Sequence, residues 1–176
     1  AAALTGVGAA GRPYDRIALD LALKTGGFGA QLEAGTMTGG GDVRRFLFLR
    51  LKSLEETLPE ALELLRDILL RPELGDEKRL RDIYLEFRNE LKASIIPGGH
   101  AYAASRAERG LSRAEAVEEK WKGISQYRFV AGLPEDRAAV TIAENCERIR
   151  RSTLTRRRLT ANFTAPAASW PRIARE

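Results

Sequence analysis

The chain has 176 residues, of which 44% are hydrophobic and 30% are charged, and its formal net charge is +5. This composition is typical of a soluble globular domain, and the length suffices for one domain with a core of its own. The sequence contains no run of about 18 apolar residues, which argues against a membrane-spanning helix, and no basic-then-apolar signal peptide. We therefore expect a soluble protein of the cytoplasm or an organellar matrix rather than a secreted one. Its abrupt start suggests a piece of a longer protein.

The positive charge is unevenly distributed along the chain. Residues 137–176 hold nine Lys or Arg and three Asp or Glu, so the excess of cations lies in this C-terminal part. The single cysteine, Cys146, excludes an internal disulfide. It lies in a predicted helix, where we expect a small buried apolar side chain rather than a reactive thiol.

The first predicted elements are a helix and a hairpin. The helix is expected over residues 14–24. Residues 28–37 alternate apolar and polar side chains, and residues 43–52 form a second strand after a turn of three glycines. Leucines alternate in this second strand with Phe46 and Phe48, so we expect it to be covered on both faces.

Two longer helices are predicted next. One is expected to run from Ser53, as its N-cap, to Pro72, and the next starts after a second capping residue, Asp76. The second helix carries an apolar stripe that keeps helical spacing for more than four turns, which predicts core packing. The stripe consists of Leu80, Ile83, Tyr84, Phe87, Leu91 and Ile95.

Shorter helices follow a break at Pro97. They are expected over 100–109, 112–122 and 125–132, and Ser112 with Glu115 forms a capping box at the start of the second. A longer helix is expected over 135–151.

The last predicted element is a third strand at 159–164, where apolar residues again alternate with polar ones. Residues 166–176 are expected to be an exit segment. We thus predict an α+β fold in which an antiparallel sheet, with strands near 28–37, 43–52 and 159–164, is packed by several helices. Residues 1–165 are expected to form this single domain.

Candidate catalytic and metal-binding residues are few. His100 is the only histidine, whereas hydrolytic zinc sites usually use two or three. We expect His100 to cap or hydrogen-bond a neighbouring element, with a substrate contact as the alternative. No G-x-S-x-G nucleophile motif occurs. The sequence therefore predicts no catalytic, cofactor-binding or metal-ligating residue in this chain.

Two further patterns have a functional and a structural interpretation. Gly6, Gly8 and Gly11 match G-x-G-x-x-G, but only five residues precede them, so a helix end and loop are favoured over a dinucleotide site. The cluster of Arg148, Arg150, Arg151, Arg156, Arg157 and Arg158 could neutralise phosphates. No aromatic residues interleave to stack bases, so we favour a solvated helix end, with an acidic partner surface or nucleic acid as alternatives.

Short motifs mark the junctions between the predicted elements. They are LTGVG at 4–8, LKTGGF at 23–28, LLRDILL at 64–70, PEL at 72–74, ASIIPGGHAYAA at 93–104 and WKGISQ at 121–126. Together they resemble the helix ends and helix-to-strand junctions of the insulinase-type zinc metallopeptidases, specifically the presequence protease branch. The resemblance covers about residues 4–164, and it departs from that branch at Gly98, which replaces a serine.

The resemblance implies the third of four similar α+β domains, which opens the C-terminal half of a clamshell-shaped enzyme. The inverted zinc motif H-x-x-E-H of such enzymes lies in their first domain and is absent here, so zinc is implied only for the catalytic half of the parent protein. No zinc ligand or catalytic glutamate transfers to any residue of this chain. Family domains also have strands before the helix that ends at Thr5, so we expect the sheet to have an unpaired edge or to pair with another copy.

From the resemblance we expect a non-catalytic domain of a zinc metallopeptidase that degrades unstructured peptides. It would form part of the chamber wall and peptide-binding surface and would be inactive alone. The expected partners are the N-terminal catalytic half of the same polypeptide and unfolded peptide; no membrane partner is expected, and nucleic acid is disfavoured. The alternatives are an inactive scaffold or assembly subunit of the same family and, less favoured, a basic nucleic-acid-binding module.

Overall fold

The structure is a computed structural model that describes residues 2–40 and 42–170. In chain order its elements are α1 (Ala2–Thr5), α2 (Tyr14–Lys24), β1 (Gly27–Gly35), β2 (Arg44–Lys52), α3 (Leu58–Leu70), α4 (Glu77–Ile95), α5 (Gly99–Glu108), α6 (Arg113–Lys122), α7 (Ile124–Ala131), α8 (Glu135–Thr153), η1 (Arg156–Arg158) and η2 (Ala167–Ser169). Helices and an antiparallel sheet together confirm the predicted α+β class.

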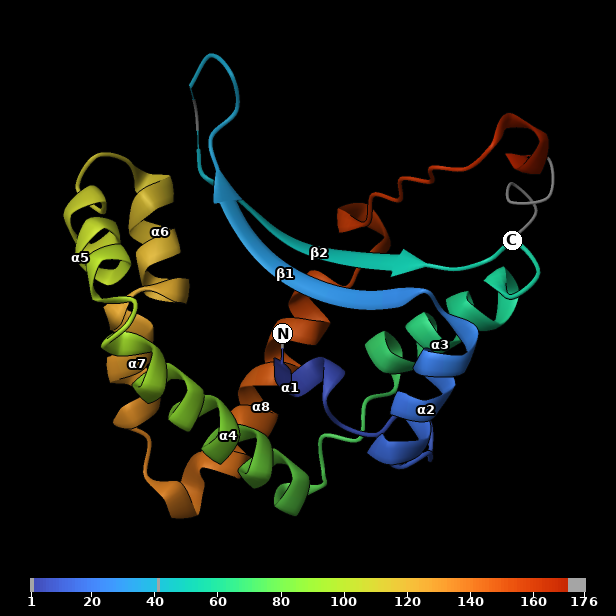
Figure 1. Ribbon diagram of the computed structural model, residues 1–176, viewed down its shortest axis with the longest axis horizontal. Coiled ribbons are helices and arrows are strands. Elements are labelled where there is room, and N and C mark those ends of the chain that lie inside the picture. Colours follow the sequence, from blue (N-terminus) through green and yellow to red (C-terminus); the bar gives the residue numbers. More distant parts are fainter. Residues whose placement is uncertain (1, 41, 171–176) are drawn as a thin grey trace.

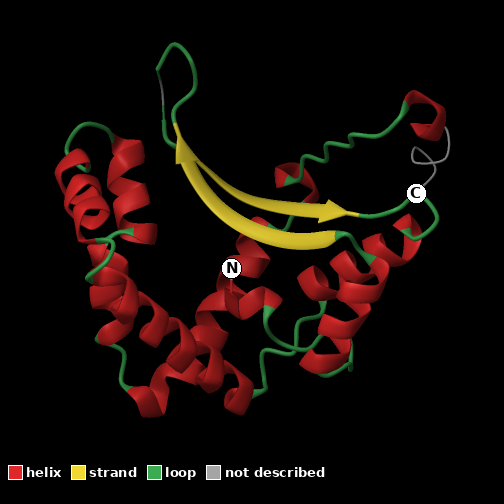
Figure 2. Cartoon of the chain, viewed as in Figure 1, coloured by secondary structure: helices red, strands yellow, loops and turns green. Residues whose placement is uncertain are grey.

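The strands β1 and β2 form a long hairpin that arches over the helices (Figure 1). The strand β1 contacts α6 and α2, the first near the tip of the hairpin and the second near its base. In Figure 2 the α-helices lie mostly on one side of the two strands, and the segment that carries η1 and η2 is drawn on the other. The hairpin thus bridges two groups of helices.

Three buried apolar clusters hold the helices together. The first contains Val7, Leu80, Ile83 and Ala139, the second Ala9, Ile17, Leu64 and Ile68, and the third Tyr84, Leu91, Val130 and Ala138. The clusters join α4 to α8 and α7, and α2 to α3. We call α2, α3, α4, α7 and α8 the helical frame. Burial of one such side chain contributes about 1.5–3 kcal/mol, so the frame accounts for much of the stability.

The central element of the frame is α4. Its predicted N-cap is confirmed, because the Asp76 carboxylate accepts a hydrogen bond of 2.9 Å from the Arg79 N–H. Four residues of the predicted stripe are buried, while Phe87 and Ile95 are half-buried. The buried Tyr84 hydroxyl donates to the Leu133 carbonyl oxygen at 2.9 Å, which fixes the segment after α7 against α4.

The hairpin lies outside these clusters, apart from Phe28, which packs against the second. No residue of either strand is fully buried: the helix-facing side chains other than Arg45 are half-buried, and most of the others are exposed. The register is regular from Gly27 opposite Lys52 to Gly35 opposite Arg44. Only two strands pair in the described residues, so the outer edge of each has no strand partner, and on β1 the Ala34 N–H donates to Glu118 of α6 instead.

The predicted third strand at 159–164 is wrong. These residues are extended but pair with no strand, and all six are exposed. Alternation of apolar and polar residues predicts a strand only where a neighbouring strand and a core accept it. The segment has neither in the described residues.

The predicted start of α3 is also wrong. This helix begins at Leu58, with Thr57 rather than Ser53 in the N-cap position. Pro59 lies in its first turn, where a fixed φ and a missing N–H are tolerated best, so the proline marks the helix start better than the earlier serine does.

The end of the described chain returns to the body of the protein. Ser169, in η2, is buried, and its hydroxyl donates a 2.8 Å hydrogen bond to the Glu55 carboxylate before α3. The predicted exit segment 166–176 begins here, and its residues 171–176 lie outside the described part.

Candidate functional site

One face of the hairpin carries cations and aromatic rings. Phe28 packs against the α2–α3 cluster, so the side chains on its face, including Leu51 directly opposite, point toward the helices. Alternate residues of a strand point to opposite faces. The other face of β2 therefore carries Arg44, Phe46, Phe48, Arg50 and Lys52. We call these five residues the basic–aromatic face.

Glycines on β1 leave much of this face uncovered. The register pairs Arg44 with Gly35, Phe46 with Glu33, Phe48 with Gln31, Arg50 with Gly29 and Lys52 with Gly27. Cross-strand neighbours normally cover side chains on a sheet, and three of these five have no side chain. Phe46 is 48% and Phe48 39% exposed, with ring centroids 5.5 Å apart. The prediction that β2 is covered on both faces is therefore wrong.

The cations of this face are not neutralised locally. Arg44, Arg50 and Lys52 form no ion pair or hydrogen bond through their side chains with any residue that the structure describes. The face holds one carboxylate, that of Glu33, against these three cations. At the tip, a shallow hollow of about 290 Å³ is lined by Gly35, Thr36, Met37, Arg44 and Phe46. Exposed rings beside unpaired cations form a surface suited to ligands.

Near its tip the hairpin is fastened to α6 by two polar contacts, one of which is the exposed ion pair of 3.5 Å between Asp42 and Arg113. The Glu118 carboxylate of α6 accepts a 2.6 Å hydrogen bond from the backbone N–H of Ala34 and forms an ion pair of 2.6 Å with Lys122. Its position depends on the corner between α6 and α7.

That corner, which contains the WKGISQ motif, is built around a buried carboxylate. Glu119 is 2% exposed and accepts hydrogen bonds of 3.2 Å from both the Ser125 N–H and the Arg106 guanidinium. Burial raises the pKa of Glu119, but the hydrogen bonds from Ser125 and Arg106 outweigh it and hold that pKa below its usual range. A Cβ at Gly123 would lie 2.6 Å from the Glu119 carbonyl oxygen, so only glycine fits here.

The turn between α4 and α5 has a structural role as well. The Tyr102 and Ser94 hydroxyls are 2.7 Å apart and hydrogen-bonded. A Cβ at Gly98 would lie 2.8 Å from the Ser94 carbonyl oxygen, so any side chain here would require this turn to shift.

The glycine-rich loop after α1 is closed to ligands, in agreement with the predicted loop. The Gly11 N–H donates to the Glu73 carboxylate at 2.8 Å, and the Gly8 carbonyl accepts from the Glu73 N–H at 2.8 Å. A Cβ at Gly8 would lie 2.4 Å from the Arg12 carbonyl oxygen. These backbone groups of the loop are thus already engaged in hydrogen bonds within the protein.

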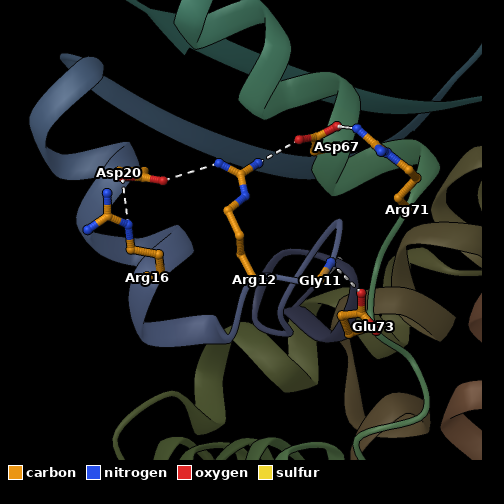
Figure 3. A network of polar contacts seen from close by, with 7 residues as sticks. All are labelled: Gly11, Arg12, Arg16, Asp20, Asp67, Arg71 and Glu73. Atoms are coloured by element: carbon orange, nitrogen blue, oxygen red, sulfur yellow. Dashed lines mark hydrogen bonds and ion pairs between the residues drawn. The ribbon is translucent and has the colours of Figure 1, made fainter.

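A network of charged residues joins this loop to α2 and α3 (Figure 3). Arg12 bonds Asp67 at 2.5 Å and Asp20 at 3.2 Å, and both carboxylates are almost fully buried. Asp67 also pairs with Arg71, and Asp20 with Arg16 at 3.3 Å. Every charged side chain drawn in Figure 3 has a partner, so the network is structural rather than a site for a ligand.

The candidate zinc and nucleophile residues do not form a site. His100 is exposed in the first turn of α5 and makes no hydrogen bond to a described residue, so its predicted capping role is wrong. Cys146 on α8 is half-buried, and burial raises the pKa of its thiol, which disfavours a reactive thiolate. Among residues 2–40 and 42–170, no three His, Cys, Asp or Glu side chains are placed to hold a metal ion.

The arginine cluster divides into a compensated part and an exposed part. Arg150 and Arg151 both pair with Glu147, at 2.7 and 2.6 Å, and lower the pKa of Glu147 to about 2. Arg148 bonds the Asn145 side chain at 2.7 Å. The arginines of η1, residues 156–158, are exposed. Glu144 and Glu147 also line the shallow hollow of about 500 Å³ on α8, so it is not a phosphate site.

Comparison with known proteins agrees with the motifs in these turns. A family model for the region associated with the M16 peptidases of subfamily C matches residues 1–133, about three quarters of the chain. The chain belongs to this peptidase-associated family. The presequence protease, mitochondrial, of Danio rerio is 28% identical over 98% of the chain, and presequence protease 1, chloroplastic/mitochondrial, of Arabidopsis thaliana is 26% identical over 83%.

The family match and these relatives place the chain in the presequence protease branch. The matched part is only 17% of the Danio rerio relative and 14% of the Arabidopsis thaliana relative. No helix that the structure describes is long and apolar enough to span a bilayer. The described residues do not fit the zinc ion of such peptidases, because they bring no set of ligands together.

Proposed function

We propose that this chain is a non-catalytic domain of a zinc peptidase, in which it forms part of the chamber wall and of the peptide-binding surface. Residues 1–165 would be the domain, and 166–176 would lead onward. Its partner would be the catalytic half of the same polypeptide, which would carry the zinc ion. The protein would work in an organelle, as the names of its mitochondrial and chloroplastic relatives suggest for them. The family match supports membership in such an enzyme.

The observation that supports the binding role is the incomplete pairing and incomplete burial of the hairpin. The outer edge of β2 has no strand partner in the described residues, and the helix-facing apolar side chains of the hairpin are only half-buried. An extended peptide can add to such an edge through backbone hydrogen bonds, while its alternate side chains contact the apolar face. Folded substrates lack free backbone groups, so this mode favours unstructured peptides.

The test uses the purified chain and an unstructured peptide that carries a fluorophore at each end. We expect saturable binding without cleavage, with or without added zinc. Cleavage that a chelator abolishes would contradict the non-catalytic role, and the absence of binding would contradict the peptide-binding role. A folded domain of similar size and charge is the matched control ligand, and it should not bind.

An inactive scaffold of the same family is the alternative against which the proposal is tested. The parent protein decides between them. A preceding domain with H-x-x-E-H, and chelator-sensitive peptide cleavage by the full-length protein, support the peptidase. A parent in which that motif is lost supports the scaffold.

A further inference from the structure

We infer that the basic–aromatic face selects peptide segments in which central apolar side chains are flanked on both sides by acidic ones. This inference rests on the proposed peptide-binding role and adds a class of ligand to it. It begins from the order of side chains on β2, where Phe46 and Phe48 lie in the middle, Arg44 lies at one end, and Arg50 with Lys52 lies at the other.

The spacing of these side chains fits an extended peptide. Side chains on one face of a strand repeat every two residues, about 6.6–6.8 Å. A peptide that runs along β2 has the same repeat, so every second residue can meet one member of the face. The ligand pattern is therefore acidic, apolar, apolar, acidic, acidic at alternate positions of a nine-residue segment, which matches the length of β2.

Charge determines the selectivity. The three cations of the face have no ion pair within the described residues, and Glu33 is the one carboxylate across from them. A basic peptide would add further positive charge beside unpaired cations, whereas an acidic one neutralises them. Each exposed ion pair is weak, about 0.2–1 kcal/mol, so several must act together to give a measurable preference.

The two rings supply the apolar part of the site. Phe46 and Phe48 are 48% and 39% exposed, and glycines opposite the flanking cations leave room beside them. Aromatic pairs with ring centroids 4.5–7 Å apart attract each other, so a phenylalanine of the ligand can extend the existing 5.5 Å pair. The hollow at the tip, which Arg44, Phe46 and Met37 line, provides further apolar surface.

The C-terminal arginine cluster lacks this combination of unpaired cations and rings. Arg150 and Arg151 are neutralised by Glu147, and no aromatic ring lines the hollow beside them. On the hairpin, by contrast, three unpaired cations flank a pair of exposed rings on one face of a single strand.

The experiment measures fluorescence anisotropy of three labelled nine-residue peptides with the full 176-residue chain. The first has Glu at positions one, seven and nine and Phe at three and five, with Ser between them. The second has Lys in place of Glu, and the third has Ser in place of Phe. We expect the first to bind at least about tenfold more tightly than the second at low salt. This preference should shrink at 0.5 M salt, where the charges are screened.

Two double variants locate the effect. Arg50→Glu with Lys52→Glu should abolish the preference for the acidic peptide. Lys78→Glu with Lys92→Glu, two exposed positions on α4, changes the net charge equally and should leave the preference intact. Phe46→Thr with Phe48→Thr should weaken binding of the first peptide to the level of the third. Threonine suits strands, and circular dichroism checks that each variant is folded.

The outcomes separate this inference from the proposed function. If the acidic and basic peptides bind equally, or if the Lys78 and Lys92 variant loses the preference too, the selectivity is overturned while peptide binding stands. If none of the peptides binds, both are overturned. If a single-stranded oligonucleotide of the same length binds more tightly than the acidic peptide, the face is a nucleic-acid site and the inference is overturned.

Discussion

The helical frame and the hairpin differ in how far their side chains are buried and their charges are paired. The frame buries whole side chains in three clusters and pairs its buried carboxylates with arginines. The hairpin buries no residue completely and leaves the cations of one face unpaired. The frame therefore stabilises itself, whereas the hairpin presents surface. The difference fits the proposed binding role of the strands, with the stability supplied by the helices.

The largest test of this contrast compares two leucines. Leu64→Ala empties a buried site beside Ile17 and Ile68 and should destabilise the chain by about 2–5 kcal/mol. Leu49→Ala, at a half-buried position on β2, should cost about 1 kcal/mol. Urea unfolding followed by circular dichroism measures both. Equal losses would mean that the hairpin is as tightly packed as the frame.

The charged network offers the next comparison. Arg12→Met removes the cation that bridges the buried Asp20 and Asp67, and should destabilise the chain by about 2–3 kcal/mol. Arg16→Met removes one contact of a largely exposed side chain and should cost less than about 0.5 kcal/mol. If Arg16→Met destabilised the chain as much as Arg12→Met does, the bridging position of Arg12 would add nothing to its contribution to stability.

The α6–α7 corner predicts a dependence on pH. Because the folded pKa of Glu119 lies below its usual 4.5, the ionised carboxylate stabilises the fold above pH 4.5, and this contribution is lost as the pH falls through the lower folded value. Glu119→Gln should cost about 1–2 kcal/mol at pH 7, and less at pH 3. Thermal unfolding across this pH range measures the gap in stability between the variant and the unsubstituted chain. Glu147, with a pKa of about 2, titrates in both proteins and cancels; a gap that stays constant with pH would contradict the assignment.

The smallest expected effect concerns the anchor of the hairpin. Glu118→Ala removes the acceptor of the Ala34 N–H, and should speed hydrogen exchange of that amide about three- to tenfold without changing exchange in α4. Lys120→Ala, an exposed change on the same helix, is the control. Slow exchange of Ala34 in the Glu118 variant would mean that another group protects the amide.

Local signals predicted much of this fold. Periodicity and capping chemistry, which act over a few residues of sequence, predicted the helix over Tyr14–Lys24, the two strands of the hairpin and the cap at Asp76. These features depend on near neighbours, so one sequence contains what is needed to place them.

The predictions failed where contacts between distant parts of the chain determine the structure. Whether Phe46 and Phe48 are covered depends on what lies over the outer face, and whether residues 159–164 pair depends on a neighbouring strand. The basic–aromatic face was missed for the same reason, although the alternation of cations and rings in RRFLFLRLK was its visible signal. The charged network was missed because Asp20 and Asp67 are 47 residues apart in the chain and meet only through Arg12.

The attachment of the hairpin at both ends has a mechanical consequence. Phe28 holds it at the base, and the Ala34 amide and the Asp42–Arg113 ion pair hold it near the tip, so it resembles a beam supported at its two ends. Such a beam bows most at mid-span, which here is the stretch around Ala30 and Leu49, and low-frequency motion should concentrate there. A molecule that lies along the outer surface would damp this bowing, and the loss of amplitude at mid-span would itself report that the surface is occupied.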